Sequence, residues 1–132
     1  MKKPKKLTPL PKLLKKVEAE VNRKVRERDS EDGYFTCINC QKTKPVEEMN
    51  AGHLIPVSKS SFLRFNMDNI HGECQGCNAY DQAKVNYTIN LIDKIGHEKV
   101  KWLTDNKRVG HKWTRYDLEK IIENLKLESM KI

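Results

Sequence analysis

The sequence lacks long hydrophobic runs, and glycine, proline and aromatic residues are all sparse. Only 37% of the 132 residues are apolar, 7% are aromatic, and the mean hydropathy is −0.78. No stretch approaches the ~20 apolar residues that a membrane-spanning helix needs, and no apolar signal segment follows the basic start. We therefore expect a cytoplasmic protein with a small core, built as one domain or as one small domain plus an arm.

Acidic residues are scarce at the start of the chain, and this imbalance accounts for the whole net charge. Residues 1–28 contain eleven Lys or Arg against three Glu, which equals the net charge of +8. Residues 29–132 contain fifteen residues of each sign. A basic block of this kind is either a solvated tail or an arm that binds a polyanion such as DNA.

Cysteine is limited to four residues, arranged as the pairs Cys37/Cys40 and Cys74/Cys77. Two such pairs in a chain without a secretory signal are typical of a tetrahedral zinc site with Zn–S distances of ~2.3 Å. The alternatives are buried free thiols or a redox pair, which does not need a second pair. Thirty-three residues separate Cys40 from Cys74, whereas a plain zinc ribbon uses ~15–20. The zinc would therefore hold an insert that carries chemistry of its own.

Hydrophobic periodicity predicts an amphipathic helix from about Pro11 to Arg28. Its apolar residues recur at steps of three and four and are Leu13, Leu14, Val17, Val21 and Val25. This stripe must be buried against the core or against a second chain. Residues 1–28 thus form a basic arm and an amphipathic helix.

The remaining sequence predicts a mixed α+β protein. Residues 29–85 contain short strand patterns at 34–37, 50–57 and 69–74, with a loop at 59–68, and form the zinc-bound core. Residues 86–132 have helical periodicity, with Gly96 as a helix stop. Thr114 and Asp117 match a capping box before the last helix, whose apolar face would be Leu118, Ile121, Ile122 and Leu125.

Four strings in the sequence can be compared with known families. They are AGH at 51–53, LRFNMDNIH at 63–71, CQGCN at 74–78 and INLIDKIG at 89–96. Together they resemble the HNH, or ββα-metal, nuclease motif, and more closely the NinG/Rap family of lambdoid phages. The resemblance spans roughly residues 30–105 and implies an HNH-like core in which a β-hairpin and a helix surround one divalent ion, Mg²⁺ or Mn²⁺, beside a structural zinc.

The resemblance also implies an activity and a place for it. The family is known for metal-dependent, structure-specific cleavage of branched DNA, such as Holliday junctions and D-loops, in phage recombination. The expected products are 5′-phosphate and 3′-hydroxyl ends, and the expected location is the host cytoplasm. Symmetric cutting of a junction needs two active sites, which would require a homodimer.

The roles of single residues follow from the same motif. His53 is at the position of the general base, and an imidazole with a pKa near 6.5 suits that task. Asn69 is at the position that orients the catalytic loop by hydrogen bonds. Asn78 is at the position that binds the catalytic metal, and Asp81, about one helical turn later, would support the ion or a water molecule.

One position departs from the motif. Many HNH proteins have a metal-binding Asp directly before the general base, and this chain has Gly52 there. The second ligand of the catalytic ion could then be His71, Asp81 or Asn50. We expect His71, because alternation along a strand places it on the same side as Asn69.

DNA is the expected partner, held through phosphate contacts rather than through base edges. The candidate contacts are the cations of the arm and one loop arginine: Lys2, Lys3, Lys5, Lys6, Lys12, Lys15, Lys16, Arg23, Lys24 and Arg64. Two other functions stay open. The chain could be a non-catalytic zinc module that binds nucleic acid, with Gly52 marking a lost metal site, or a protein-interaction domain.

Overall fold

The structure, a computed structural model, describes residues 7–130 and has a mixed α+β fold. The described residues form five α-helices, which are α1 (Leu10–Asp29), α2 (Gln75–Tyr80), α3 (Val85–Ile95), α4 (His97–Asp105) and α5 (Arg115–Met130). The strands are β1 (Ser30–Glu31), β2 (Tyr34–Thr36), β3 (Thr43–Pro45), β4 (Met49–His53) and β5 (Ile70–Cys74). No helix in residues 7–130 is long and apolar enough to cross a membrane.

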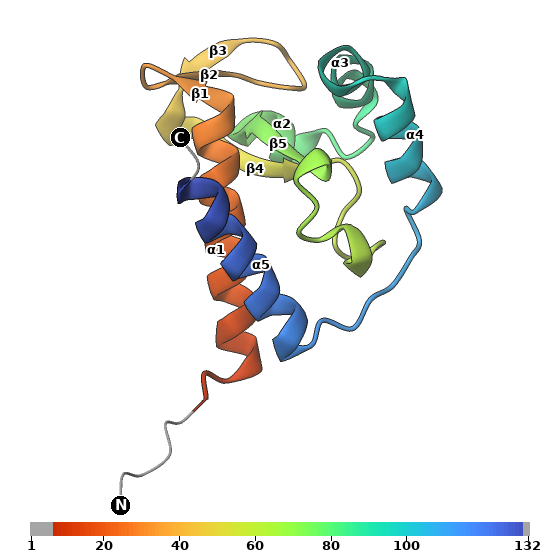
Figure 1. The fold of residues 1–132 in the computed structure, drawn as a ribbon. Coiled ribbons are helices and arrows are strands. Elements are labelled where there is room, and N and C mark those ends of the chain that lie inside the picture. Colours follow the sequence, from red (N-terminus) through yellow and green to blue (C-terminus); the bar gives the residue numbers. More distant parts are fainter. Residues whose placement is uncertain (1–6, 131–132) are drawn as a thin grey trace, which may run out of the picture.

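Helices α1 and α5 lie side by side along one flank of the molecule (Figure 1). The predicted stripe of α1 is buried there, with Val17 and Val25 fully enclosed, and it packs against Leu118, Ile122 and Leu125 of α5. The stripe is therefore covered by the chain's own core. The predicted capping box is confirmed: the Asp117 amide donates to Thr114 Oγ1 at 3.2 Å, and the Thr114 amide donates to the Asp117 carboxylate at 3.1 Å.

The strands form two small antiparallel sheets, one of β1, β2 and β3 and one of β4 and β5. The second sheet is a hairpin that lies between the α1/α5 pair and the α3/α4 pair (Figure 1). Its register pairs Gly52 with His71 and His53 with Ile70. A second apolar cluster joins α3 and α4 to the segment after β4, through Leu54, Leu63, Leu91 and Leu103.

The strand predicted at residues 50–57 is shorter than expected. Strand β4 begins at Met49 and ends at His53, because the chain turns away there into a long loop that contains two 3₁₀ turns, η2 (Ser61–Leu63) and η3 (Met67–Asn69). His53 is thus the last strand residue, at the point where the chain leaves the hairpin. The hairpin then continues through β5 directly into α2, so a β–β–α unit spans residues 49–80.

Candidate functional site

The four cysteines lie together at one end of the hairpin. Their sulfur atoms are all within 4.8 Å of one another, and Cys40 Sγ lies 4.0 Å from Cys74 Sγ. None of them forms a disulfide. Four thiolates around a zinc ion at ~2.3 Å would be separated by ~3.8 Å, so a small contraction converts this cluster into a tetrahedron. The four cysteines could therefore bind Zn²⁺.

Backbone amides donate hydrogen bonds to two of these sulfur atoms. Cys37 Sγ accepts hydrogen bonds from the amides of Asn39, Cys40 and Cys74 at 3.3–3.4 Å. Cys74 caps the start of α2, where its sulfur accepts from the Cys77 amide at 3.5 Å. Burial raises the pKa of the Cys37 thiol above its usual range, against these amides, so a bound divalent cation is what would favour the thiolate.

The hairpin displays its side chains on two faces, because neighbouring strand residues point in opposite directions. His53 and its partner Ile70 are on one face, and Gly52 and its partner His71 are on the other. The two histidines of the predicted site are therefore separated by the sheet.

His53 is half-buried at the end of β4. Its Nε2 donates to the backbone carbonyl of Arg64 at 3.0 Å, which leaves Nδ1 of the neutral ring as the proton acceptor. Burial lowers the pKa of His53 below its ordinary value of 6.5, and the Arg64 carbonyl partly opposes this shift. The lowered pKa favours the neutral ring, and the Arg64 carbonyl favours the tautomer with its proton on Nε2, which is the state that a general base requires.

Asn69 is fully buried and joins the ends of the long loop. Its Oδ1 accepts from the Ile55 amide at 2.9 Å, and its Nδ2 donates to the carbonyls of Ile55 and Leu63 at 3.0 and 3.3 Å. Its own carbonyl accepts from the Leu54 amide at 2.9 Å. These bonds fix the chain directly after His53, which is the kind of contact expected of a residue that orients the catalytic loop.

Asn78 lies on α2 and faces the same pocket as His53. The pocket is open, has a volume of about 250 Å³, and is lined by Ala51, His53, Pro56, Val57, Asn78, Gln82 and Lys84. In the described part of the chain, no hydrogen bond holds the Asn78 side-chain amide. Its oxygen is therefore available to a ligand, one residue beyond a cysteine that anchors the backbone.

None of the three candidates for a second ligand of the catalytic ion lines the pocket that contains Asn78. Asp81 lies just beyond the end of α2, and its two carboxylate oxygens accept from Asn39 Nδ2 at 3.1 Å and from the Lys84 amide at 3.2 Å. Asn50 and His71 are on the hairpin face opposite His53. The sheet therefore separates His71, the ligand expected from the sequence, from His53.

His71 is enclosed in a cluster of charged groups. Its Nε2 donates to the Asp68 carbonyl at 2.8 Å, and its Nδ1 accepts from Arg28 at 3.0 Å and Lys94 at 2.9 Å. Burial, together with the Lys94 and Arg28 charges, lowers the pKa of His71 to about 4. Both ring nitrogens are occupied, so His71 has no lone pair for a metal ion and acts here as a buried structural residue.

A second buried network lies behind Gly52. Glu73 is fully buried, and its carboxylate accepts from Lys84 Nζ and from Asn39 Nδ2 at 3.1 Å. A side chain at position 52 would overlap the Glu73 carboxylate, so the absence of a side chain there is a packing requirement. Lys84 also lines the pocket with His53 and Asn78, and Asn39 lies between two cysteines. The network thus connects Asn39, between the first two cysteines, to Lys84 in the lining of the pocket.

Comparison with known proteins places the chain in a family. A family model described as "Bacteriophage Lambda NinG protein" matches residues 1–131. The chain belongs to the NinG family. It is 35% identical over 102 residues to Protein ninG of Escherichia phage lambda and 34% identical over 110 residues to Protein ninG of Salmonella phage P22. These alignments cover 76% and 82% of this chain.

The NinG relatives are longer than this chain. The chain spans about half of their length, 48% for the phage lambda protein and 51% for the phage P22 protein. No solved structure matches the chain. Family membership agrees with the resemblance seen in the sequence motifs.

The predicted DNA-binding cations of this NinG chain differ in their environment. Arg23 is in ion pairs with Glu20 at 2.9 Å and Glu27 at 2.6 Å, and Lys24 lies 3.8 Å from Glu27. Arg64 contacts Glu18 at 3.5 Å and lies beside His53 in a second pocket. Exposed lysines without an ion pair in the described residues are Lys12, Lys15 and Lys16, whereas Lys2, Lys3, Lys5 and Lys6 lie outside the described residues.

The sequence did not reveal the buried ion pair of Lys84 and Glu73, which lies next to the pocket. Lys84 was not singled out, because its partner Glu73 is eleven positions away on another element. One signal was present: Glu73 follows His71 at a strand spacing of two and precedes Cys74. A carboxylate at an inward strand position next to a zinc ligand requires a buried cation or donor.

Proposed function

We propose that this NinG-family chain is a metal-dependent endonuclease that cleaves branched DNA in phage recombination. The observation that carries the proposal is the shared pocket of His53 and Asn78 on one β–β–α unit. A proton acceptor of fixed tautomer and an amide oxygen without a partner in the described residues meet there, at the surface, where a phosphodiester can enter.

The donor set fits a weakly held divalent ion. Asn78 would supply one oxygen ligand, and Mg²⁺ commonly keeps several waters and takes its other ligands from substrate phosphates. When bound, the ion would supply positive charge against the phosphate during displacement. Because the carboxylates of Glu73 and Asp81 already accept hydrogen bonds from Lys84 and Asn39, affinity for the ion would depend strongly on the DNA.

Three residues of the chain would have separate roles in the reaction. His53 Nδ1 takes a proton from water, whose oxygen forms a bond to phosphorus as the bond from phosphorus to the 3′ oxygen breaks. The 3′ oxygen takes a proton from solvent, leaving 3′-hydroxyl and 5′-phosphate ends. The Arg64 carbonyl keeps the His53 proton on Nε2, and Asn69 keeps the loop in place.

A second candidate function is a zinc-containing protein that binds nucleic acid without cutting it. The observation that favours it is the lack of a second protein ligand beside Asn78 in the described residues, since Gly52 has no side chain and His71 is enclosed.

A cleavage assay separates these functions. The chain would be incubated with four-way, forked and linear DNA of one sequence, with and without added Mg²⁺ or Mn²⁺. The nuclease proposal expects cutting that needs the metal and favours branched DNA. Binding without cutting under every condition would establish the second candidate, and neither binding nor cutting would contradict both. Two coupled cuts in one junction would indicate a homodimer.

A further inference from the structure

The segment that connects α4 to α5 is strongly basic, although the sequence count hides this. Residues 106–114 contain three Lys or Arg and no Asp or Glu. The other residues between 29 and 132 therefore hold twelve cations against fifteen acids. The apparent neutrality of this part of the chain is the sum of a basic connector, defined here as residues 106–114, and an acidic remainder.

The connector has no regular secondary structure, but hydrogen bonds hold it in place. Ser60 Oγ donates to the carbonyls of Asn106 and Val109 at 3.0 and 2.9 Å. Ser61 Oγ accepts from the His111 amide at 2.8 Å, and the Ser61 carbonyl accepts from Trp113 Nε1 at 2.8 Å. The connector is therefore a fixed surface rather than a loose linker, and its charges have defined positions.

Its cations are exposed and lack partners. Lys107, Arg108 and Lys112 are all exposed, and none makes an ion pair within residues 7–130. Arg23 of α1, by contrast, is paired with Glu20 and Glu27. A fixed group of unpaired cations is costly through mutual repulsion, and a polyanion would relieve that repulsion.

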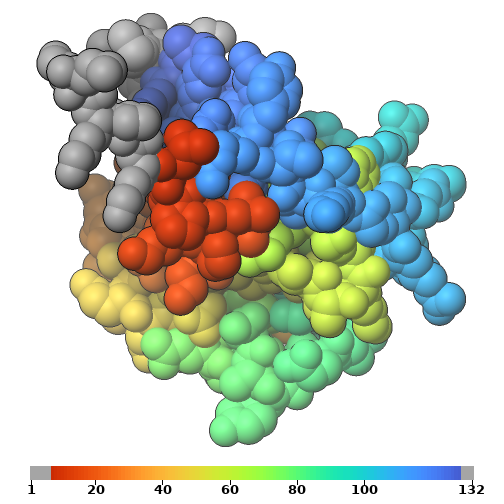
Figure 2. All heavy atoms as spheres, turned by 90° about the horizontal axis from the view of Figure 1, so that it is seen from below, coloured from red at the N-terminus to blue at the C-terminus, as the bar shows by residue number. Residues whose placement is uncertain are grey.

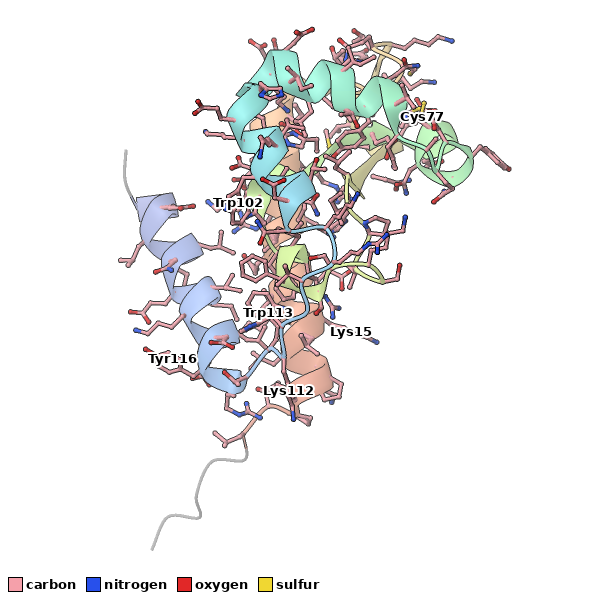
Figure 3. All side chains as sticks on the ribbon, turned by 90° about the vertical axis from the view of Figure 1, so that its right-hand side faces the viewer. Lys15, Cys77, Trp102, Lys112, Trp113 and Tyr116 are labelled. Atoms are coloured by element: carbon pink, nitrogen blue, oxygen red, sulfur yellow. The ribbon has the colours of Figure 1, made fainter. Side chains whose placement is uncertain are left out.

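The connector lies on the same side of the molecule as the His53 pocket. The segment that pins it, residues 60–62, leads to Arg64, whose carbonyl binds His53. Figure 2 shows the start of α1 in red, residues near 60 in yellow-green, α2 in green and the connector in light blue on one face. In Figure 3 the connector passes in front of α1, with Lys112 and Lys15 at the same end of the molecule.

We infer that the connector is a second contact surface for the DNA backbone, placed beside the pocket and acting together with Lys12, Lys15 and Lys16 of α1. This inference rests on the proposed function, since it assumes that DNA crosses the pocket. Lysine and arginine side chains that make no ion pair suit phosphate contacts, which position DNA without reading its sequence. A duplex that leaves the pocket in this direction would meet the connector, so the surface would hold one arm of a branched substrate.

The test compares two matched pairs of substitutions. Lys107→Gln/Lys112→Gln removes two charges from the connector, and Lys42→Gln/Lys44→Gln removes two from the region of β3. Binding of fluorescent linear duplex and four-way DNA would be measured from 50 to 300 mM salt without added Mg²⁺, so that no cutting occurs. Each phosphate contact contributes ~0.9 to the salt slope, so the connector variant should have a slope shallower by about 1.8 and bind about tenfold or more weakly at low salt.

The control variant should keep the wild-type slope. Equal slopes for the two variants, or no binding by the wild-type chain, would overturn the connector surface. Both outcomes are distinguishable from failure of the proposed function, because cleavage of the same junction at saturating protein is scored separately. Melting temperatures of both variants should match the wild type, since these side chains are largely exposed.

Discussion

The two faces of the β4–β5 hairpin carry one histidine each, and the histidines differ in almost every property. His53 has one ring nitrogen bound to a carbonyl and lines an open pocket with Asn78. His71 has both ring nitrogens in hydrogen bonds and is enclosed by Arg28 and Lys94. The face of His53 borders an open pocket at its edge, where β4 ends, although Ile70 on that face is buried against α1. The face of His71 is closed by its own partners.

The difference shows that a residue type in a motif does not determine its role. Both histidines are in the strings that resemble the NinG family, and burial lowers the pKa of each. They differ because the two strand positions point to opposite faces, and because Arg28 of α1 and Lys94 of α3 bind only His71.

Zinc removal should have the largest effect, because it affects both faces. β5 ends at Cys74, and Asn39, which lies between Cys37 and Cys40, binds Glu73. A structural zinc contributes on the order of 10 kcal/mol to small domains, so chelation should unfold residues 34–80. Metal analysis should find about one zinc per chain. A zinc-free chain with an unchanged melting temperature and circular dichroism would contradict the assignment.

Asn78→Ala should affect the pocket that Asn78 shares with His53 and leave the surroundings of His71 unchanged. Loss of the amide oxygen should remove most of the cleavage, about 100-fold or more, and raise the concentration of Mg²⁺ or Mn²⁺ needed for half-maximal rate. Gln75→Ala, an exposed residue of the same helix, is the control and should behave as the wild type. A metal titration that is the same for both variants would remove Asn78 from the site.

His71→Gln should affect only the closed face, through the dependence of stability on pH. The pKa of His71 is about 4 in the folded chain, against 6.5 when unfolded. The unfolded state therefore binds more protons in this range, and stability is full above pH 6.5 and falls as the pH decreases toward 4. Between pH 7.5 and 5.5, denaturant unfolding should show that the wild type loses about 1.4 kcal/mol more stability than the variant, because the lowered pKa of His53 contributes to the loss in both. An equal loss in both would show that His71 is not its source.

Deletion of Met1–Lys6 should have the smallest effect, because it removes charge from outside the described residues and leaves both faces intact. Four lysines are lost, so binding to every DNA shape should weaken by a similar factor and the salt slope should become shallower by up to ~0.9 per lost contact. The preference for branched over linear DNA should remain. If that preference alone were lost, recognition of shape would belong to the arm.

Local patterns in the sequence were sufficient for much of the fold. The apolar stripe of α1, the stop at Gly96, the Thr114/Asp117 cap and the pairing of the two cysteine motifs all depend on residues a few positions apart, or on metal chemistry that fixes the spacing. The strand that begins near residue 50 was predicted, but its end at His53 was not. The chain turns there because of contacts with residues far along the sequence, such as those of Asn69 with Ile55.

The side-chain environment of the site could not be predicted in the same way. Arg28 and His71 are 43 positions apart, and Asn39 and Glu73 are 34 apart, so only the folded chain brings them together. The pairing of Arg23 on α1 and the lack of pairing along the connector are also invisible to a charge count. The roles of His53, Asn69 and Asn78 therefore stay predictions from their motif, and the structure adds that His71 lies on the hairpin face opposite His53.

The most direct test of the account is a single-turnover cleavage assay of His53→Ala on a four-way junction with Mg²⁺ or Mn²⁺, beside His97→Ala, an exposed histidine of α4. Loss of a general base costs ~100- to 10,000-fold, so His53→Ala should lose cleavage by this factor while its DNA affinity and melting temperature stay near those of the wild type. His97→Ala should cut normally. Cleavage by His53→Ala at close to the wild-type rate would contradict the assignment of His53 as the base and, with it, the open face of the hairpin as the active site.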